Sequence, residues 1–148
     1  MYKNILVAID DSETSRSALK EALHIAKTSS AKLYITHVAD ETMLNLHGHA
    51  MSSAVNLDGA VANLLQAGQK LLDKAMESAA GIDAEPLMLE ASKRRISEVI
   101  ADKAKELGID LIIIGRHGQR GLATFILGSV AEQLARIADA SVLLVRKH

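Results

Sequence analysis

The stretch Ile5-Leu6-Val7-Ala8-Ile9-Asp10-Asp11 combines an uninterrupted apolar run with an abrupt acidic end. A continuous run of this kind is typical of a strand that is buried on both faces, as in the parallel sheets of α/β proteins. Residues 111–114, Leu-Ile-Ile-Ile, have the same character and are followed by Gly115. The two runs predict the central strands of a sheet that carries helices on both faces.

Strand and helix patterns alternate along the rest of the chain. Apolar residues recur at helical spacing between Ser12 and Thr28 and across residues 61–79, 96–107 and 129–138. Further strands are predicted at 32–38, 86–89 and 142–145, and Pro86 favours a sheet edge for the 86–89 strand. Because parallel strands need crossover connections, the sequence predicts one α/β domain over residues 1–148. Its doubly wound, five-stranded parallel sheet has the predicted strand order 3-2-1-4-5.

Residues 40–58 are polar or small and show no clear period. They predict a loop that is long enough to have a function of its own. His47 and His49 lie in this segment, but no further ligands accompany them, so no metal site is predicted.

The composition excludes several classes of function. The 148 residues suffice for one hydrophobic core. The chain has no Cys, which excludes disulfides and thiolate metal sites, and its lack of Trp and single Phe leave no stacking platform for single-stranded nucleic acid. A formal charge of −1 also argues against nucleic-acid binding. No apolar run approaches the length of a membrane span, and the first is too short for a signal peptide, so we expect a cytoplasmic protein.

The most suggestive residues follow the first and fourth predicted strands. In doubly wound sheets, ligands bind at the carboxyl ends of the strands where the strand order reverses, here between Asp10 and Gly115. Four of the nine glycines lie within residues 115–128, where they permit close approach to an anion. Ser129 then opens a helix, and the unsatisfied amides of a helix N-terminus attract phosphate. Asp10 would accept a hydrogen bond from a ribose or help to hold a cation.

A purely structural interpretation of the same residues stays open. Ser129-Val130-Ala131-Glu132 also fits a capping box, which stabilises a helix without any ligand. The P-loop pattern and the Rossmann glycine pattern are both absent, so neither common nucleotide motif applies.

The glycine segment resembles that of the universal stress protein family. Gly115-x2-Gly118-x9-Gly128-Ser129 is similar to the family's ATP-binding signature, G-x2-G-x9-G-[ST], and residues 127–132 and 143–146 also resemble family sequence. The resemblance implies a flavodoxin-like dimer that binds an adenine nucleotide, ATP or alternatively AMP, with Mg²⁺ accompanying ATP. The residues that would line the site are Ala8, Ile9, Asp10 and Val38 on the adenine and ribose side and Ile114, Gly115, Arg116, Gly118, Gly128, Ser129, Val130 and Ala131 around the ribose and phosphates.

Two of the residues that would line the site depart from the family pattern. Arg116 stands where the family often has Ser or Thr, and it would either pair with a phosphate or crowd the pocket. Ala131 lacks the hydroxyl that many members carry there.

His117 would contact the terminal phosphate or remain a solvated loop residue. The basic triplet Lys93-Arg94-Arg95 is interpreted as a solvated face, and His37 as a structural histidine.

The last predicted strand, Val142–Val145, is apolar and lies at a sheet edge under the predicted order. An exposed edge of this kind can pair with another chain, which predicts a homodimer joined through this strand.

Three functions remain open from the sequence. The first is a regulatory stress-response protein that binds ATP. The second is a weak ATPase or nucleotidyl-transfer enzyme, although no catalytic residues are identified. The third is a dimeric interaction module that binds no nucleotide.

Overall fold

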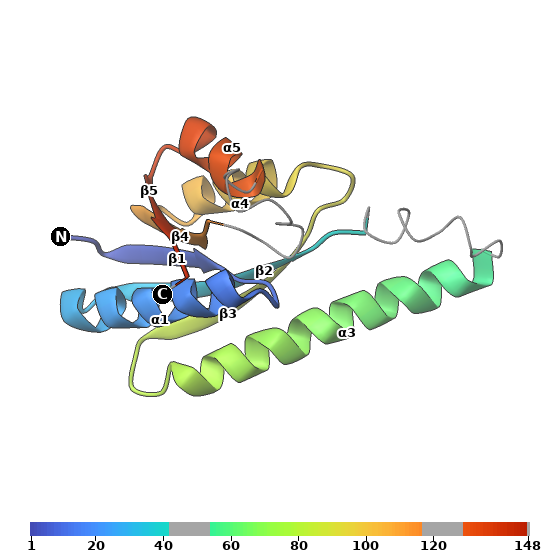
Figure 1. Cartoon of the computed structure of the whole chain (residues 1–148), viewed down its shortest axis with the longest axis horizontal. Helices are drawn as coiled ribbons and strands as arrows, with labels where there is room; N and C mark the ends of the chain where they lie inside the picture. The colour runs from blue at the N-terminus through green and yellow to red at the C-terminus, as the bar shows by residue number, and fades with distance from the viewer. Residues whose placement is uncertain (42–53, 117–128, 148) are drawn as a thin grey trace.

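A computed structural model describes residues 1–41, 54–116 and 129–147. The described part of the chain contains five strands and four helices, in alternating order (Figure 1). The elements are β1 (Asn4–Ala8), α1 (Glu13–Ser29), β2 (Lys32–Ala39), α3 (Ala54–Ser78), β3 (Ala84–Glu90), α4 (Ile96–Glu106), β4 (Leu111–Gly115), α5 (Ser129–Ile137) and β5 (Ser141–Val145).

All five strands form one parallel sheet in the order β3-β2-β1-β4-β5, which confirms the predicted topology. The apolar runs of β1 and β4 are neighbours at its centre, with Ala8 opposite Ile114. Pro86 lies in β3, which is an edge strand as predicted and leaves a position where a missing N–H is tolerated.

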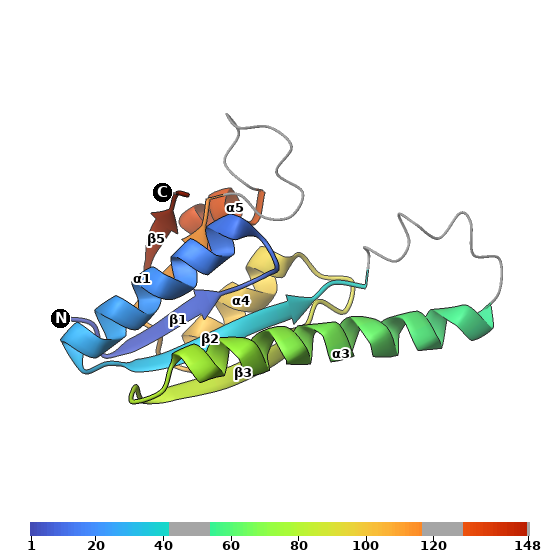
Figure 2. The same cartoon turned by 60° about the horizontal axis from the view of Figure 1, so that its bottom comes forward.

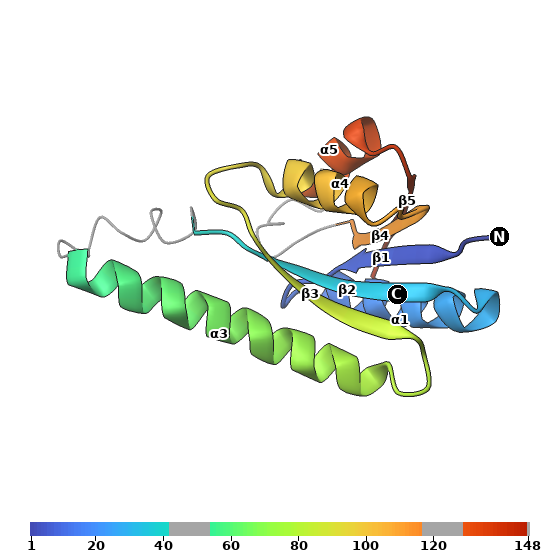
Figure 3. The same cartoon turned by 180° about the vertical axis from the view of Figure 1, so that it is seen from behind.

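Helices cover both faces of the sheet. Figures 1 and 3 show α1 and α3 on one side and α4 and α5 on the other. The core beneath α1 and α3 includes Ala18, Ala22 and Leu72 packed against Ile5 and Val7. The core beneath α4 and α5 is built from alternate strand residues such as Leu6 and Ile112, together with Ile100 and Leu134 from the two helices. Strand alternation thus divides the apolar side chains between two layers, as expected for a doubly wound sheet.

The helix α3 begins at Ala54, seven residues before the predicted start at Val61. The predicted loop 40–58 is therefore wrong for residues 54–58, and its residues 42–53 lie outside the described residues. Leu57 stands four residues before Val61, so the helical spacing already starts there, although Gly59 disguises it. In Figure 2 the N-terminal half of α3 extends well past the sheet, whereas its C-terminal half packs beneath it.

No helix in the described ranges is long and apolar enough to cross a membrane.

Candidate functional site

The carboxyl ends of β1 and β4 form the point where the strand order reverses. From β1 the chain continues through α1 to β2 on one side, whereas β4 pairs with β1 on its other side. Connections that diverge in this way leave a crevice outside the strand ends, where open α/β sheets bind ligands. The described residues that were predicted for the site cluster at this edge.

The end of β1 is fixed by side chains of the following turn. The Asp10 amide donates to Ser15 Oγ at 2.8 Å, and Asp10 Oδ1 accepts from the Ser12 amide at 2.8 Å. Ser12 is the N-cap of α1, and its hydroxyl accepts from the Ser15 amide at 3.1 Å. These bonds hold the half-buried Asp10 in one orientation at the edge of the sheet.

The end of β4 lies directly against the first turn of α1. Gly115 is buried there beside Thr14 and has no room for a side chain. The Arg116 amide continues the ladder to Val145 with a bond of 2.8 Å to its carbonyl. Arg116 Nε is buried and has no hydrogen-bond partner among the described residues. A buried guanidinium nitrogen without a partner retains a donor that an anion can use.

The face of the sheet that α4 and α5 cover carries Ala8, Val38 and Ile114, which pack against the core beneath these two helices. They form an apolar group drawn from the ends of three neighbouring strands. Ile9 packs instead into the core beneath α1 and α3 and is 6% exposed. It can therefore reach a ligand at the edge only through its backbone.

Helix α5 begins at Ser129, as predicted, and its first residues differ in exposure. Ser129 is exposed and Val130 is half-buried, whereas the methyl group of Ala131 is buried in the core beneath α4 and α5. Ala131 can therefore offer a ligand its amide but not its side chain. Only residues 138–140 separate α5 from β5, so the helix runs back along the strand and its N-terminus points to the carboxyl edge.

Glu132 bears on the capping-box alternative. Its Oε1 accepts from Arg136 Nη2 at 2.8 Å, an exposed pair between residues four apart. This pair engages Glu132 within the helix, away from its first amides. One carboxylate oxygen of Glu132 is thus engaged by Arg136 rather than by the start of the helix.

Several predicted residues cannot be placed. Gly118, Gly128 and His117 lie outside the described residues, as do His47 and His49. Within the described ranges, no cluster of three or more His, Cys, Asp or Glu side chains is arranged to hold a metal ion.

The basic triplet Lys93-Arg94-Arg95 follows β3, and Arg94 forms an ion pair at the surface. Arg94 Nη2 lies 2.6 Å from Asp102 Oδ2, and this hydrogen bond raises the pKa of the Arg94 guanidinium. The three side chains are exposed, which agrees with a solvated face. His37 forms a hydrogen bond inside the fold, as expected for a structural histidine.

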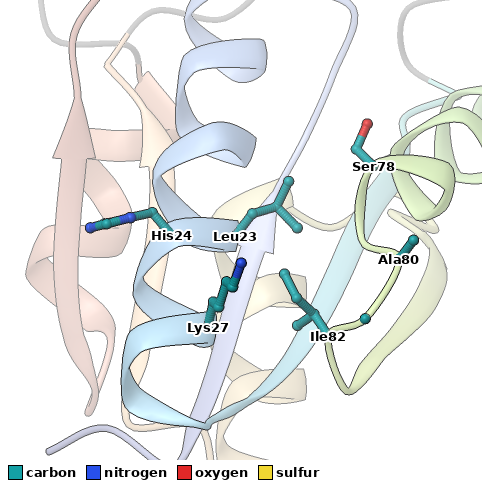
Figure 4. Close-up of a pocket in the computed structure, with 7 residues that line it drawn as sticks. Leu23, His24, Lys27, Ser78, Ala80 and Ile82 are labelled. Atoms are coloured by element: carbon teal, nitrogen blue, oxygen red, sulfur yellow. The ribbon is translucent and has the colours of Figure 1, made fainter.

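A shallow pocket of about 320 Å³ lies elsewhere, between α1 and the turn after α3. In Figure 4, Leu23 and Ile82 point toward one another across it, whereas His24 points away. These residues lie near the C-terminal ends of both helices and so at the amino edge of the sheet. The pocket is therefore remote from the residues predicted to bind a ligand.

The strand order defines a flavodoxin-like α/β protein whose switch point lies between β1 and β4. The model of the universal stress protein family matches residues 1–146, and the chain belongs to this family.

The chain is 34% identical over 151 positions to universal stress protein YxiE of Bacillus subtilis (strain 168), covering 99% of this chain and 100% of the relative. The structure of universal stress protein UspA from Lactobacillus plantarum superposes with a TM-score of 0.76 at 25% identity, over 98% of each chain.

Two further solved structures of the same fold contain nucleotides. One is a universal stress protein in complex with cAMP, with a TM-score of 0.66 at 23% identity over 99% of this chain and 98% of that one. The other is the Archaeoglobus fulgidus protein in complex with dAMP, with a TM-score of 0.61 at 21% identity over 97% of this chain and 98% of that one.

Proposed function

We propose that this protein binds an adenine nucleotide, with ATP as its principal ligand, at the carboxyl ends of β1 and β4. It would act as a cytoplasmic, single-domain stress-response protein whose bound nucleotide regulates its conformation or its partners. The observation that carries the proposal is the cation at the switch point: the buried Arg116 Nε has no hydrogen-bond partner in the described part of the chain. A structural role alone does not require a cation there.

The two sides of the edge suit the two ends of the ligand. Ala8, Val38 and Ile114 form an apolar group that would pack against the adenine ring. Asp10 is held where its carboxylate would accept from a ribose hydroxyl. The phosphates would lie over Gly115 and the first amides of α5, where the helix dipole favours negative charge.

Mg²⁺ fits this site only together with the phosphates. The described residues offer Asp10 but no larger group of acidic ligands at the edge. Mg²⁺ is commonly held by one or two carboxylates together with substrate phosphates and water, so ATP would bring most of its own ligands. The related proteins in complex with cAMP and dAMP support an adenine nucleotide as the ligand class.

The proposed assembly is a homodimer joined through β5. This strand is a sheet edge, and its residues 142–144 are only half-buried although all three are apolar. A second copy that pairs antiparallel with β5 would satisfy its outer N–H and C=O groups and cover these side chains.

Calorimetry with ATP, AMP and cAMP tests the proposal, with Gly118→Ala and Gly128→Ala as site variants. The proposal requires that ATP binds and that both variants weaken it. ATP affinity unchanged in both variants would refute this placement of the site. Mass spectrometry of the purified, denatured protein gives a second readout, because an adenine nucleotide retained after purification counts against a module that binds none.

A further inference from the structure

His37 lies in β2, the neighbour of β1, and directly precedes Val38 of the apolar group that is proposed to hold the adenine. Its ring nitrogen Nδ1 is 2.8 Å from the carbonyl oxygen of Ile9. Because a carbonyl only accepts, Nδ1 must carry the proton in this bond. No backbone N–H of the described residues donates to Ile9 O, although Ile9 N itself donates to Thr36 O at 2.8 Å. The ring therefore supplies the bond that a continuing parallel ladder would have supplied next.

The peptide between Ile9 and Asp10 is consequently held at both ends. Its carbonyl accepts from His37 Nδ1, and its N–H donates to Ser15 Oγ at 2.8 Å. Two bonds on opposite sides of a planar peptide fix its rotation about the chain. The orientation of this peptide sets the direction in which the Asp10 side chain leaves the backbone, and the Ser12 amide, 2.8 Å from Oδ1, then holds the carboxylate.

The ring itself is held in place by α3. A Cβ on Gly68 would lie 2.6 Å from His37 Cδ2 and 3.1 Å from Nε2, and 2.7 Å from Met88 Cε. Only a glycine allows the helix to approach the ring this closely. Helix α3 runs alongside β2 and β3 in Figures 2 and 3, so it covers the ring on the face opposite α4 and α5.

We propose that His37 is a positioning residue of the nucleotide site. It fixes the Ile9–Asp10 peptide in the orientation that presents Asp10 to the ribose, and Gly68 of α3 holds its ring in place. This inference rests on the proposed function. It adds to that function a residue whose side chain lies on the opposite face of the sheet from the apolar group Ala8, Val38 and Ile114.

Two substitutions separate positioning from packing. His37→Asn retains an amide N–H near the place of Nδ1, whereas His37→Leu retains bulk but removes the donor. His24→Leu is the matched control, because His24 is exposed on α1 at the other end of the sheet. Each variant is titrated with ATP by calorimetry, and its unfolding in urea is measured without nucleotide.

His37→Leu should bind ATP about tenfold more weakly, because binding must then supply roughly the free energy of one hydrogen bond to orient the Ile9–Asp10 peptide. His37→Asn should bind ATP within about threefold of wild type, because its amide retains most of the hydrogen bond. The affinity of the His24→Leu control should equal that of wild type. Equal affinity in wild type and His37→Leu overturns the inference, as does equal weakening in both His37 variants. A wild-type protein that binds no ATP refutes the proposed function instead.

A measurement on the wild-type protein avoids any question of whether a variant folds. ¹⁵N NMR of the imidazole distinguishes its two neutral tautomers. The inference requires the tautomer that is protonated at Nδ1 in the nucleotide-free protein, and protonation at Nε2 alone overturns it.

Discussion

Gly115 at the end of β4 lies so close to Thr14 in the first turn of α1 that a side chain at position 115 would collide with the Thr14 backbone. A Cβ at position 115 would lie 2.8 Å from Thr14 Oγ1 and 2.9 Å from the Thr14 carbonyl carbon. The hydroxyl could turn away, but the backbone carbon could not. The close packing of β4 on α1 therefore requires glycine at position 115 whether or not a ligand binds. The absence of a side chain also sets the distance between β4 and the N-terminus of α1.

Gly115→Ala should destabilise the fold by about 1–3 kcal/mol, the usual cost of overpacking a rigid contact. We also expect weaker nucleotide binding, because the end of β4 must move away from α1. Urea unfolding measures the first effect and calorimetry the second. A variant as stable as wild type would show that the contact yields easily. Adding Thr14→Ala should not restore stability, since the backbone contact persists.

Two glycines of α3 offer a matched comparison. Gly59 is exposed, and a Cβ at that position would have no described atom within 4 Å, whereas Gly68 lies against His37 and Met88. Gly59→Ala should stabilise the protein by about 0.5–1 kcal/mol through helix propensity. Gly68→Ala should destabilise it by about 1–2 kcal/mol, because the methyl group displaces the imidazole. Thermal or urea unfolding measures the stability of the two variants. A stabilising effect at both positions would contradict the close packing at Gly68.

The outer edge of β5 can be tested without disturbing its inner edge. Ser141 N donates to Asp110 O in the direction of β4, so strand alternation directs the Val142 N–H outward. Val142→Pro removes this outward donor and should convert the proposed dimer to a monomer. Val142→Ala retains the donor and should remain dimeric. Sedimentation equilibrium of both variants measures the association, and a dimeric Val142→Pro protein would mean that another surface is used.

The N-cap of α1 stabilises the start of the helix that follows β1. Ser12→Ala removes the acceptor for the Ser15 amide and should cost about 1 kcal/mol. Ser17→Ala on the same helix is the control, because the Ser17 hydroxyl makes a long bond of 3.4 Å to the Glu13 carbonyl and its loss should change stability by less than about 0.5 kcal/mol. Chemical denaturation compares the two, and equal losses would contradict the capping role.

The central part of the fold could be predicted because its signals are local. The apolar runs of β1 and β4 identify buried strands, and their acidic and glycine ends identify the edge where they stop. The start of α3 escapes prediction because Gly59 and polar neighbours interrupt a pattern that already begins at Leu57. In a helix that extends past the sheet, hydrophobic spacing is a weaker guide than it is over the core.

The described residues proposed for the site lie at the edge that the sequence indicates, but several of their side chains point elsewhere than expected. The sequence groups Ile9 with Ala8 and Asp10, yet Ile9 points into the opposite core. Likewise, Ala131 is buried and can contribute only its amide. The contact of His37 with Ile9 joins residues 28 apart, and that of Gly68 with His37 joins α3 to β2. Strand alternation could have revealed the direction of Ile9, but the two His37 contacts depend on tertiary packing that no local pattern encodes.

The most direct test of the account is a crystal structure of the protein grown or soaked with millimolar ATP and Mg²⁺. We expect adenine density against Ala8 and Val38, with the phosphates over Gly115 and the N-terminus of α5. A well-ordered edge without nucleotide density, or ATP bound instead in the pocket beside Leu23 and Ile82, would contradict it.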